Sequence, residues 1–250
     1  MKQLEGKVAI VTGGAAGFGE GIVRLFVEQG ARVVLADLDV AKGEALARQL
    51  GAATRFVRCD VAVGSDVATL VTSCVEAFGV PDIVINNAGT THTNQPMLNV
   101  DEATFDRMFA VNVKSIYHMA QAVVPLMRRR RKGVIINIGS TAGIRPRPGL
   151  TWYNASKGAV NLLSKSMAVE LGPDGIRVNA ICPVIGETGL LEKFMGVPDT
   201  PENRTRFIAT IPLGRLSRAS DVAAAALYLA SEAAEFISGV ELPVDGARTV

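Results

Sequence analysis

Cysteine and histidine are scarce in this chain of 250 residues, which contains three cysteines and two histidines. Cys59, Cys74 and Cys182 are odd in number and none belongs to a CxxC pair, so the sequence suits neither a disulfide framework nor a zinc site. We therefore expect free thiols in a reducing compartment and no bound metal.

An excess of charge of one sign and long apolar runs are also lacking. The 26 Lys and Arg residues against 24 Asp and Glu residues leave a net charge of +2, too small to indicate a nucleic-acid or membrane partner. No apolar run approaches the roughly 20 residues of a membrane span, and the first residues lack the pattern of a secretory signal. We expect a cytoplasmic protein that binds neither membrane nor nucleic acid.

Short β-branched runs alternate along the chain with longer helical patterns. The strand-like runs cover residues 8–11, 32–36, 54–58, 83–86, 133–138, 177–181 and 240–244. The helical patterns cover residues 19–29, 41–49, 66–78, 102–127, 153–171 and 219–229. This alternation predicts an α/β fold with a parallel sheet covered by helices on both faces. An irregular, proline-containing segment at about 188–212 interrupts the pattern and predicts a substrate lid rather than a second domain.

The first strand-like run is followed by the glycine-rich turn TGGAAGFG at 12–19 and then by a helix. Glycines at such a junction let the backbone approach a pyrophosphate, which the helix N-terminus also attracts. Asp37 ends the second run, 18 residues after Gly19, where a carboxylate accepts hydrogen bonds from ribose hydroxyls. A tight turn and a solvated strand-end acid are the alternatives to a dinucleotide site.

Further polar residues follow later strand-like runs. Asp60, the NNAG sequence at 86–89 and Ser140 stand at three such ends, and Tyr153 and Lys157 come 13 and 17 residues after Ser140. Residues at i and i+4 share a helix face, so the lysine ammonium lies beside the phenol. A nearby cation stabilises phenolate, which predicts a lowered pKa for Tyr153.

These motifs together resemble those of the short-chain dehydrogenase/reductase family in its compact form of roughly 250 residues, and the resemblance covers nearly the whole chain. The resemblance implies a single Rossmann-type, doubly wound domain over residues 1–250 with a seven-stranded parallel sheet. It also implies a catalytic tetrad of Asn112, Ser140, Tyr153 and Lys157. In that tetrad Tyr153 is the general acid/base, Ser140 binds the substrate oxygen, Lys157 holds the nicotinamide ribose, and Asn112 anchors a water.

The resemblance also implies a set of residues that hold the dinucleotide. These are Gly13, Gly17, Phe18, Gly19, Asp37, Leu38, Asp60, Val61, Asn87, Ala88, Gly89, Tyr153, Lys157, Pro183, Ile185, Gly186 and Thr188. After the sixth strand the family pattern is PGxxxT, whereas this chain has Val184 in place of the glycine and a glycine two residues later. We expect binding to survive with an altered backbone path.

The cofactor expected is NAD. Asp37 repels a 2′-phosphate, and the turn holds Ala15 and Ala16 where NADP-preferring members often carry a basic residue. Arg145 and Arg147 stand between Ser140 and Tyr153, where they either meet an anionic or polar substrate or lie on the surface. The basic run at 128–132 either forms a solvated helix end or contacts an acyl carrier protein, a partner that the acid at Asp174 disfavours.

Three functions follow from these features. The first is an NAD(H)-dependent oxidoreductase that interconverts a secondary alcohol and a ketone. The second is a 3-oxoacyl-[acyl-carrier-protein] reductase that uses NADPH, and the third is a non-catalytic NAD(H)-binding scaffold. The resemblance also implies a homotetramer, with the helices at 102–127 and 153–171 in one interface and the C-terminal strand in another. The apolar positions of these two helices exceed what one sheet face covers. These positions are Ile116, Met119, Val123, Val160, Leu163 and Met167.

Overall fold

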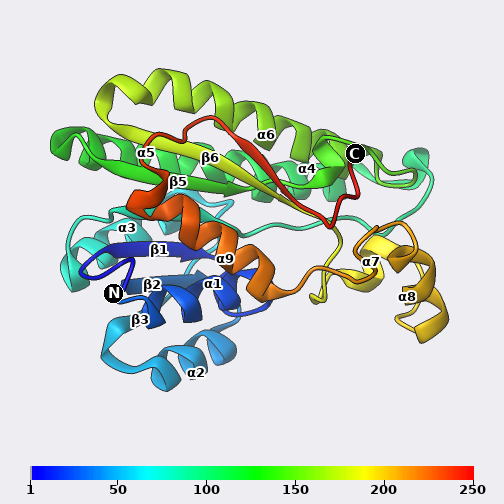
Figure 1. Cartoon of the computed structure of the whole chain (residues 1–250), viewed down its shortest axis with the longest axis horizontal. Coiled ribbons are helices and arrows are strands. Elements are labelled where there is room, and N and C mark those ends of the chain that lie inside the picture. Colours follow the sequence, from blue (N-terminus) through cyan, green and yellow to red (C-terminus); the bar gives the residue numbers. More distant parts are fainter. Residues whose placement is uncertain (1) are drawn as a thin grey trace.

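The computed structural model describes residues 2–250 and contains one parallel sheet in the order β3-β2-β1-β4-β5-β6-β7 (Figure 1). Its strands are β1 (Val8–Thr12), β2 (Arg32–Asp37), β3 (Thr54–Arg58), β4 (Ile83–Asn86), β5 (Gly133–Ile138), β6 (Ile176–Pro183) and β7 (Glu241–Val244). The seven-stranded Rossmann-type sheet predicted from the sequence is therefore confirmed.

Helices cover both faces of this sheet. They are α1 (Gly17–Glu28), α2 (Val40–Leu50), α3 (Gly64–Phe78), α4 (Glu102–Phe109), α5 (Ser115–Arg130), α6 (Thr151–Leu171), α7 (Leu191–Met195), α8 (Pro201–Ile208) and α9 (Ala219–Ala230). Along β1, Ala9 and Val11 pack with α1 and α9, whereas Val8 and Ile10 pack with α3 and α5. Within residues 2–250, none of these helices combines the length and apolar character that crossing a membrane requires.

The strand order reverses between β1 and β4, which lie side by side although two strands separate them in the sequence. Ligands of such sheets bind outside the carboxyl ends of the strands at this point. Here the Thr12 hydroxyl accepts hydrogen bonds from the backbone N–H groups of Asn87 and Ala88, both at 3.1 Å. The two loops that border the crevice are thus joined to each other.

The single long helix predicted over residues 102–127 is wrong. A π-helical turn, Ala110–Lys114, separates α4 from α5. Its Asn112 side chain is buried and bonds to residues outside the helix, which favours the wider turn over a regular α-helical one.

The apolar surplus predicted on these helices is also mostly absent. Ile116, Met119, Val123 and Val160 are at most 2% exposed within the single chain, because they pack into its own core. The apolar side chains that remain exposed on α5 and α6 are different ones, namely Tyr117, Leu162 and Val169.

Arginines of the basic run tie the end of α5 to neighbouring loops. Arg128 binds Asp174 at 2.6 Å, Arg130 binds Asp82 at 2.8 Å, and Arg131 donates to the carbonyl of Pro173 at 2.7 Å. These contacts connect the helix end to the segments before β4 and β6. Most of the run therefore serves internal contacts of the chain.

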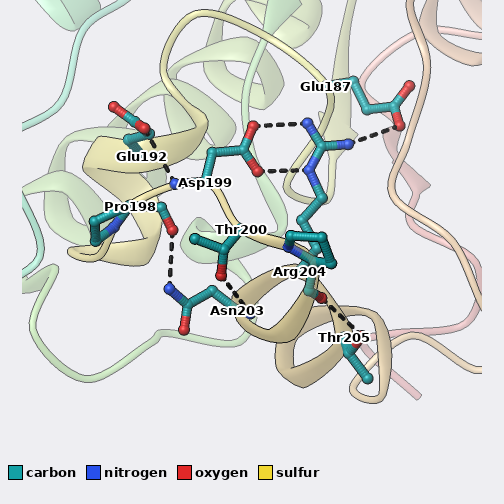
Figure 2. A network of polar contacts seen from close by, with 9 residues as sticks. Glu187, Glu192, Pro198, Asp199, Thr200, Asn203, Arg204 and Thr205 are labelled. Atoms are coloured by element: carbon teal, nitrogen blue, oxygen red, sulfur yellow. Dashed lines mark hydrogen bonds and ion pairs between the residues drawn. The ribbon is translucent and has the colours of Figure 1, made fainter.

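The segment 188–212, predicted to be a lid, contains α7 and α8, which lie together at one end of the molecule (yellow in Figure 1). Arg204 of α8 binds both carboxylate oxygens of Asp199 and lies 3.5 Å from Glu187, next to the end of β6 (Figure 2). The ion pairs hold α8 against the loop that leads out of the sheet. Movement of this segment stays a prediction.

Candidate active site

A cavity of about 550 Å³ opens at the carboxyl ends of the strands. It is lined by most of the residues that the sequence pointed to. These are Gly13, Gly17, Phe18, Asp37, Leu38, Asp60, Val61, Asn87, Ala88, Gly89, Ser140, Tyr153, Lys157, Pro183, Ile185, Gly186 and Thr188. Gly19 and Asn112 do not line the cavity but contact residues that do.

The glycine-rich turn has no room for a side chain at Gly13 or Gly19. Gly13 and Gly17 have φ values of +62° and +56°, a conformation that favours glycine. A Cβ on Gly13 would lie 2.9 Å from the Cα of Ala88, and one on Gly19 would clash with the Gly13 carbonyl. The Asn87 amide fixes the turn by donating to the carbonyls of Thr12 and Gly13, each at 2.9 Å.

Asp37 faces this turn from the end of β2. One carboxylate oxygen accepts the Ala15 N–H at 3.0 Å, and the other accepts the Asp39 N–H at 3.1 Å. Each oxygen keeps a lone pair for a further donor. The negative charge therefore lies at the cavity wall beside the turn, next to the half-exposed Leu38.

Asp60 has a partner that the sequence did not indicate. Arg107 of α4 donates to both its oxygens, at 3.0 and 3.3 Å. Burial opposes ionisation of this carboxyl, but the Arg107 guanidinium and the Ala62 N–H together hold the pKa of Asp60 below its ordinary value. Asp60 therefore remains ionised and fixes this wall of the cavity.

Asn112 holds the loop after β4 against α6. Its side-chain oxygen accepts the Thr90 N–H at 2.8 Å, and its NH₂ group donates to the Thr90 carbonyl at 2.9 Å and the Ser156 hydroxyl at 3.0 Å. Gly89 lies directly beside it, facing Lys157 as well. The role predicted for Asn112 as the anchor of a water stays a prediction.

Tyr153 lies on the first turn of α6 and is 7% exposed, with its ring 5.0 Å from that of Phe194 in α7. Burial raises the pKa of Tyr153 to about 12, and a hydrogen bond with Ser140 acts in the opposite direction. The prediction of a lowered pKa is therefore wrong for the protein alone. The phenol holds its proton at neutral pH.

Lys157 lies one helical turn after Tyr153, and its ammonium bonds to the backbone. Its Nζ donates to the Ile138 carbonyl at 2.7 Å and lies 6.0 Å from the centre of the Tyr153 ring. Burial lowers the pKa of Lys157 to about 8, so most of its charge is retained at pH 7 and about half is lost at pH 8. The two side chains share one helix face, as predicted, and both line the cavity.

The loop after β6 is held by Ser217, and the altered backbone path expected there stays a prediction. Ser217 donates its hydroxyl to the Val184 carbonyl at 3.1 Å and its N–H to the Ile185 carbonyl at 3.2 Å. A Cβ on Gly186 would clash with the Phe18 ring at 2.5 Å, so the displaced glycine lets that ring pack closely. Ser217 was not predicted, because its distance in sequence gave no signal of this pairing.

Comparison with known proteins places the chain among oxidoreductases. A protein-family model described as Enoyl-(Acyl carrier protein) reductase matches residues 13–248. The 4-formylbenzenesulfonate dehydrogenase of Comamonas testosteroni is 47% identical over 255 residues, with 99% of each chain covered. The 2-(R)-hydroxypropyl-CoM dehydrogenase of Xanthobacter autotrophicus is 39% identical over 249 residues, covering 97% of this chain and 98% of the relative.

A solved structure shows the same fold throughout. The 3-ketoacyl-(acyl-carrier-protein) reductase from Brucella melitensis, described as complexed with NADH, has a TM-score of 0.94 and 42% sequence identity, covering 99% of this chain and all of the other. The family match, these relatives and the arrangement of the cavity agree. The chain belongs to the short-chain dehydrogenase/reductase family of oxidoreductases.

Proposed function

We propose that this protein is an NAD(H)-dependent oxidoreductase that interconverts a secondary alcohol and a ketone. The observation that carries the proposal is one cavity lined at one wall by the glycine-rich turn and Asp37, and at another by Ser140, Tyr153 and Lys157. The first set suits a dinucleotide and the second suits proton transfer to a carbonyl oxygen.

The residues of the turn fit a dinucleotide. The close approach of Gly13 to Ala88 leaves bare backbone facing the cavity, and the N-terminus of α1 follows directly, as pyrophosphate binding requires. Asn87 fixes the turn, and Thr188 lies at its far side against Gly17. When bound, the nicotinamide ring supplies the hydride acceptor or donor.

The chain's own residues move the proton. In the reductive direction Tyr153 donates its phenolic proton to the substrate oxygen, while the Ser140 hydroxyl donates a hydrogen bond to the same oxygen. The raised pKa of Tyr153 keeps the phenol protonated, which suits this direction near neutral pH. In the oxidative direction the Tyr153 phenolate takes the hydroxyl proton of the alcohol, so oxidation gains rate as pH rises.

The choice of NAD over NADP rests on Asp37. Its carboxylate lies at the end of β2 with both oxygens held by backbone N–H groups, so it cannot turn away without losing them. No basic residue stands at Ala15, Ala16 or Leu38 to bind a 2′-phosphate. Arg107, the cation at this wall of the cavity, is bound to Asp60.

Two other reactions of the same site have support. The Brucella melitensis structure favours reduction of a 3-oxoacyl group, although Asp174 binds Arg128 and reduces the charge offered to an acidic carrier protein. The similarity to the Comamonas testosteroni dehydrogenase supports oxidation of an aldehyde as a second candidate reaction. The hydrate of an aldehyde would present a hydroxyl group to Tyr153, as an alcohol does. Each is tested in the same assay.

The test is a turnover assay with NAD and NADP against secondary alcohols, aldehydes and acetoacetyl-CoA, followed by absorbance of the reduced nicotinamide. We expect turnover of a secondary alcohol or its ketone with NAD(H). Reduction of acetoacetyl-CoA with NADPH alone would favour the carrier-protein reductase. Tight NADH binding with no turnover of any compound would favour the non-catalytic scaffold.

A further inference from the structure

Three arginines line the cavity beyond Tyr153. Arg145 and Arg147 come from the loop between β5 and α6, and Arg248 comes from the C-terminal segment. The Arg145 guanidinium donates to the Arg248 carbonyl at 2.9 Å, so the two segments are in contact. The Arg147 guanidinium lies 4.7 Å from the centre of the Phe207 ring in α8. Two separate parts of the chain therefore bring positive charge to one end of the cavity, and α8 contributes an aromatic ring beside it.

Within the described residues 2–250, these arginines have no acidic partner. Among the ion pairs of residues 2–250, none includes Arg145, Arg147 or Arg248, whereas Arg204 and Arg215 of the neighbouring segments each bind a carboxylate. Over the same residues, the guanidinium groups of Arg147 and Arg248 make no hydrogen bond to a protein acceptor. Their N–H donors therefore remain available on the cavity side.

Nearby groups hold the cluster in place without neutralising it. The Asn154 amide donates to the Arg147 carbonyl at 2.8 Å, which fixes the loop to the first turn of α6 beside Tyr153. Asp245 is the acid closest in sequence to Arg248, but its oxygens accept the N–H groups of Ala247 and Thr249 and the Thr249 hydroxyl. That carboxylate shapes the C-terminal turn from which Arg248 projects.

Like charges gathered at a cavity wall need a counter-charge. Burial and the neighbouring Arg248 charge lower the pKa of Arg147, while Tyr153 acts on it in the opposite direction, so all three groups share one electrostatic environment. A guanidinium presents a fixed fork of donors that matches an oxyanion such as a carboxylate or a sulfonate. The cluster thus offers both the charge and the donors that such a group requires.

We propose that Arg145, Arg147 and Arg248 form a subsite for a carboxylate or sulfonate group carried by the substrate. The inference rests on the proposed oxidoreductase function and narrows it to anionic hydroxy or oxo compounds. The anionic group would anchor one end of the substrate near α8, and its carbonyl or hydroxyl would face Ser140 and Tyr153. The lid segment would then take part in binding through Phe207, which supports the face of the Arg147 guanidinium.

The test compares a carboxylate with a neutral amide of nearly the same shape and adds a sulfonate as a second anion. We would measure kcat/KM for 4-(1-hydroxyethyl)benzoate, 4-(1-hydroxyethyl)benzenesulfonate and the neutral 4-(1-hydroxyethyl)benzamide with NAD. A charge-assisted hydrogen bond favours the anions by about tenfold or more over the amide. Equal kcat/KM values for the anions and the amide would overturn the subsite while leaving the oxidoreductase function standing.

Single substitutions show which arginines produce the preference for anionic substrates. Arg147→Met and Arg248→Met should each lower the ratio of anionic to neutral kcat/KM at least about fivefold, the loss expected for one such bond. Arg206→Met removes an exposed arginine of α8 that does not line the cavity, and it should leave the ratio unchanged. A preference that survives in both Arg147→Met and Arg248→Met would overturn the assignment. Thermal unfolding of each variant checks that it is folded.

A binding measurement tests whether the subsite binds anions even if no compound is turned over. Calorimetry on the NADH-saturated protein should show that benzoate and benzenesulfonate bind, and that benzamide binds at least about tenfold more weakly. Loss of anion binding on saturation with NADH would place the anion in the pyrophosphate site and overturn the proposal. Failure of all alcohols and ketones to react, with anion binding intact, would instead count against the oxidoreductase function alone.

Discussion

Asp37 places one negative charge where the two nicotinamide cofactors differ. Its oxygens are held by the backbone N–H groups of Ala15 and Asp39, so the charge is fixed rather than mobile. Two like unit charges about 4 Å apart repel by roughly 1–4 kcal/mol near a protein surface. Three kcal/mol of that range corresponds to roughly a 150-fold preference, since each 1.4 kcal/mol or so is tenfold.

We therefore expect kcat/KM with NAD to exceed that with NADP by at least tenfold. Asp37→Asn keeps an oxygen for the Ala15 N–H but removes the charge, so it should cut this preference sharply. Asp39→Asn is the matched control, because Asp39 caps α2 and does not line the cavity. Equal use of the two cofactors by the unmodified protein would contradict the assignment of Asp37 to the ribose.

Lys157 makes folding stability depend on pH. Burial lowers its pKa from 10.5 to about 8, so between these values the unfolded chain holds a proton that the folded chain has lost. The free energy of unfolding therefore rises with pH across this window. Below about pH 8 the folded protein holds the buried ammonium, so the whole destabilisation from burying that charge is present there. Lys157→Met lacks this titration and serves as the reference.

Urea unfolding of both proteins at several pH values checks this. From pH 8 to 10.5 the unmodified protein should gain up to about 3 kcal/mol relative to Lys157→Met, at about 1.36 kcal/mol for each pKa unit. The Tyr153 titration cancels in the comparison, because both proteins retain it. If the difference in free energy of unfolding between the two proteins stays constant across this pH range, the pKa of Lys157 is not lowered by folding.

Individual site residues could be predicted where the residue type and its distance along the chain from a strand end or another motif both fit the site. The glycine-rich turn, Asp37 and the pair of Tyr153 and Lys157 all line the cavity that the sequence implied. The direction in which the Tyr153 pKa moves was not predictable, because it is set mainly by the burial of the phenol in the folded chain. Arg248 was missed for a similar reason, since only the folded chain brings the C-terminus beside Arg145.

At the scale of elements, a buried chain of amides joins two strands to α6. The Asn86 amide donates to the Asn137 side-chain oxygen at 2.8 Å, and the Asn137 amide donates to the Ser164 hydroxyl at 2.9 Å. Asn137 is wholly buried between them. These bonds set the position of α6, and hence of Tyr153, relative to the ends of β4 and β5.

Asn137→Ala should lower the free energy of unfolding by about 1–3 kcal/mol, because the Asn86 amide is left buried without its acceptor. Denaturant unfolding followed by circular dichroism measures the loss. Asn99→Ala, an exposed position, should change stability by less than about 0.5 kcal/mol. A loss for Asn137→Ala no larger than that of this control would rule out a stabilising role for the amide chain.

Element boundaries followed from periodicity except where a tertiary contact intervened. The strands and most helices lie close to the ranges expected, because buried parallel strands and amphipathic helices have distinct periods. The π-helical turn at Ala110–Lys114 was not visible in the sequence. It depends on the bonds that Asn112 makes to Thr90 and Ser156, residues distant in the chain.

At the scale of the whole molecule, apolar side chains remain exposed along α5 and α6. Tyr117, Leu162 and Val169 are 58%, 64% and 81% exposed. Burying such surface against another copy of the chain is favourable, at roughly 25 cal/mol for each Å² of apolar area. We therefore still predict a homotetramer, with these exposed residues in the interface in place of the buried ones first expected.

Light scattering at micromolar concentration should give a mass four times the chain mass of 26.3 kDa. Leu162→Glu introduces a charge on the exposed face of α6, so it should shift the mass towards smaller species. Val40→Glu is the control, because Val40 is also exposed and its helix α2 lies on the opposite side of the molecule from α5 and α6 (Figure 1). A monomer for the unmodified protein would contradict this account of the surface.

We propose that Tyr153 carries the proton in hydride transfer within this cavity. The most direct measurement is the turnover of Tyr153→Phe on the best alcohol substrate, together with its affinity for NADH. Phenylalanine keeps the ring packed on Phe194 but has no proton to transfer. We predict that turnover falls by at least roughly 10²–10⁴-fold while NADH affinity stays within a few-fold. Turnover close to that of the unmodified protein would contradict the account.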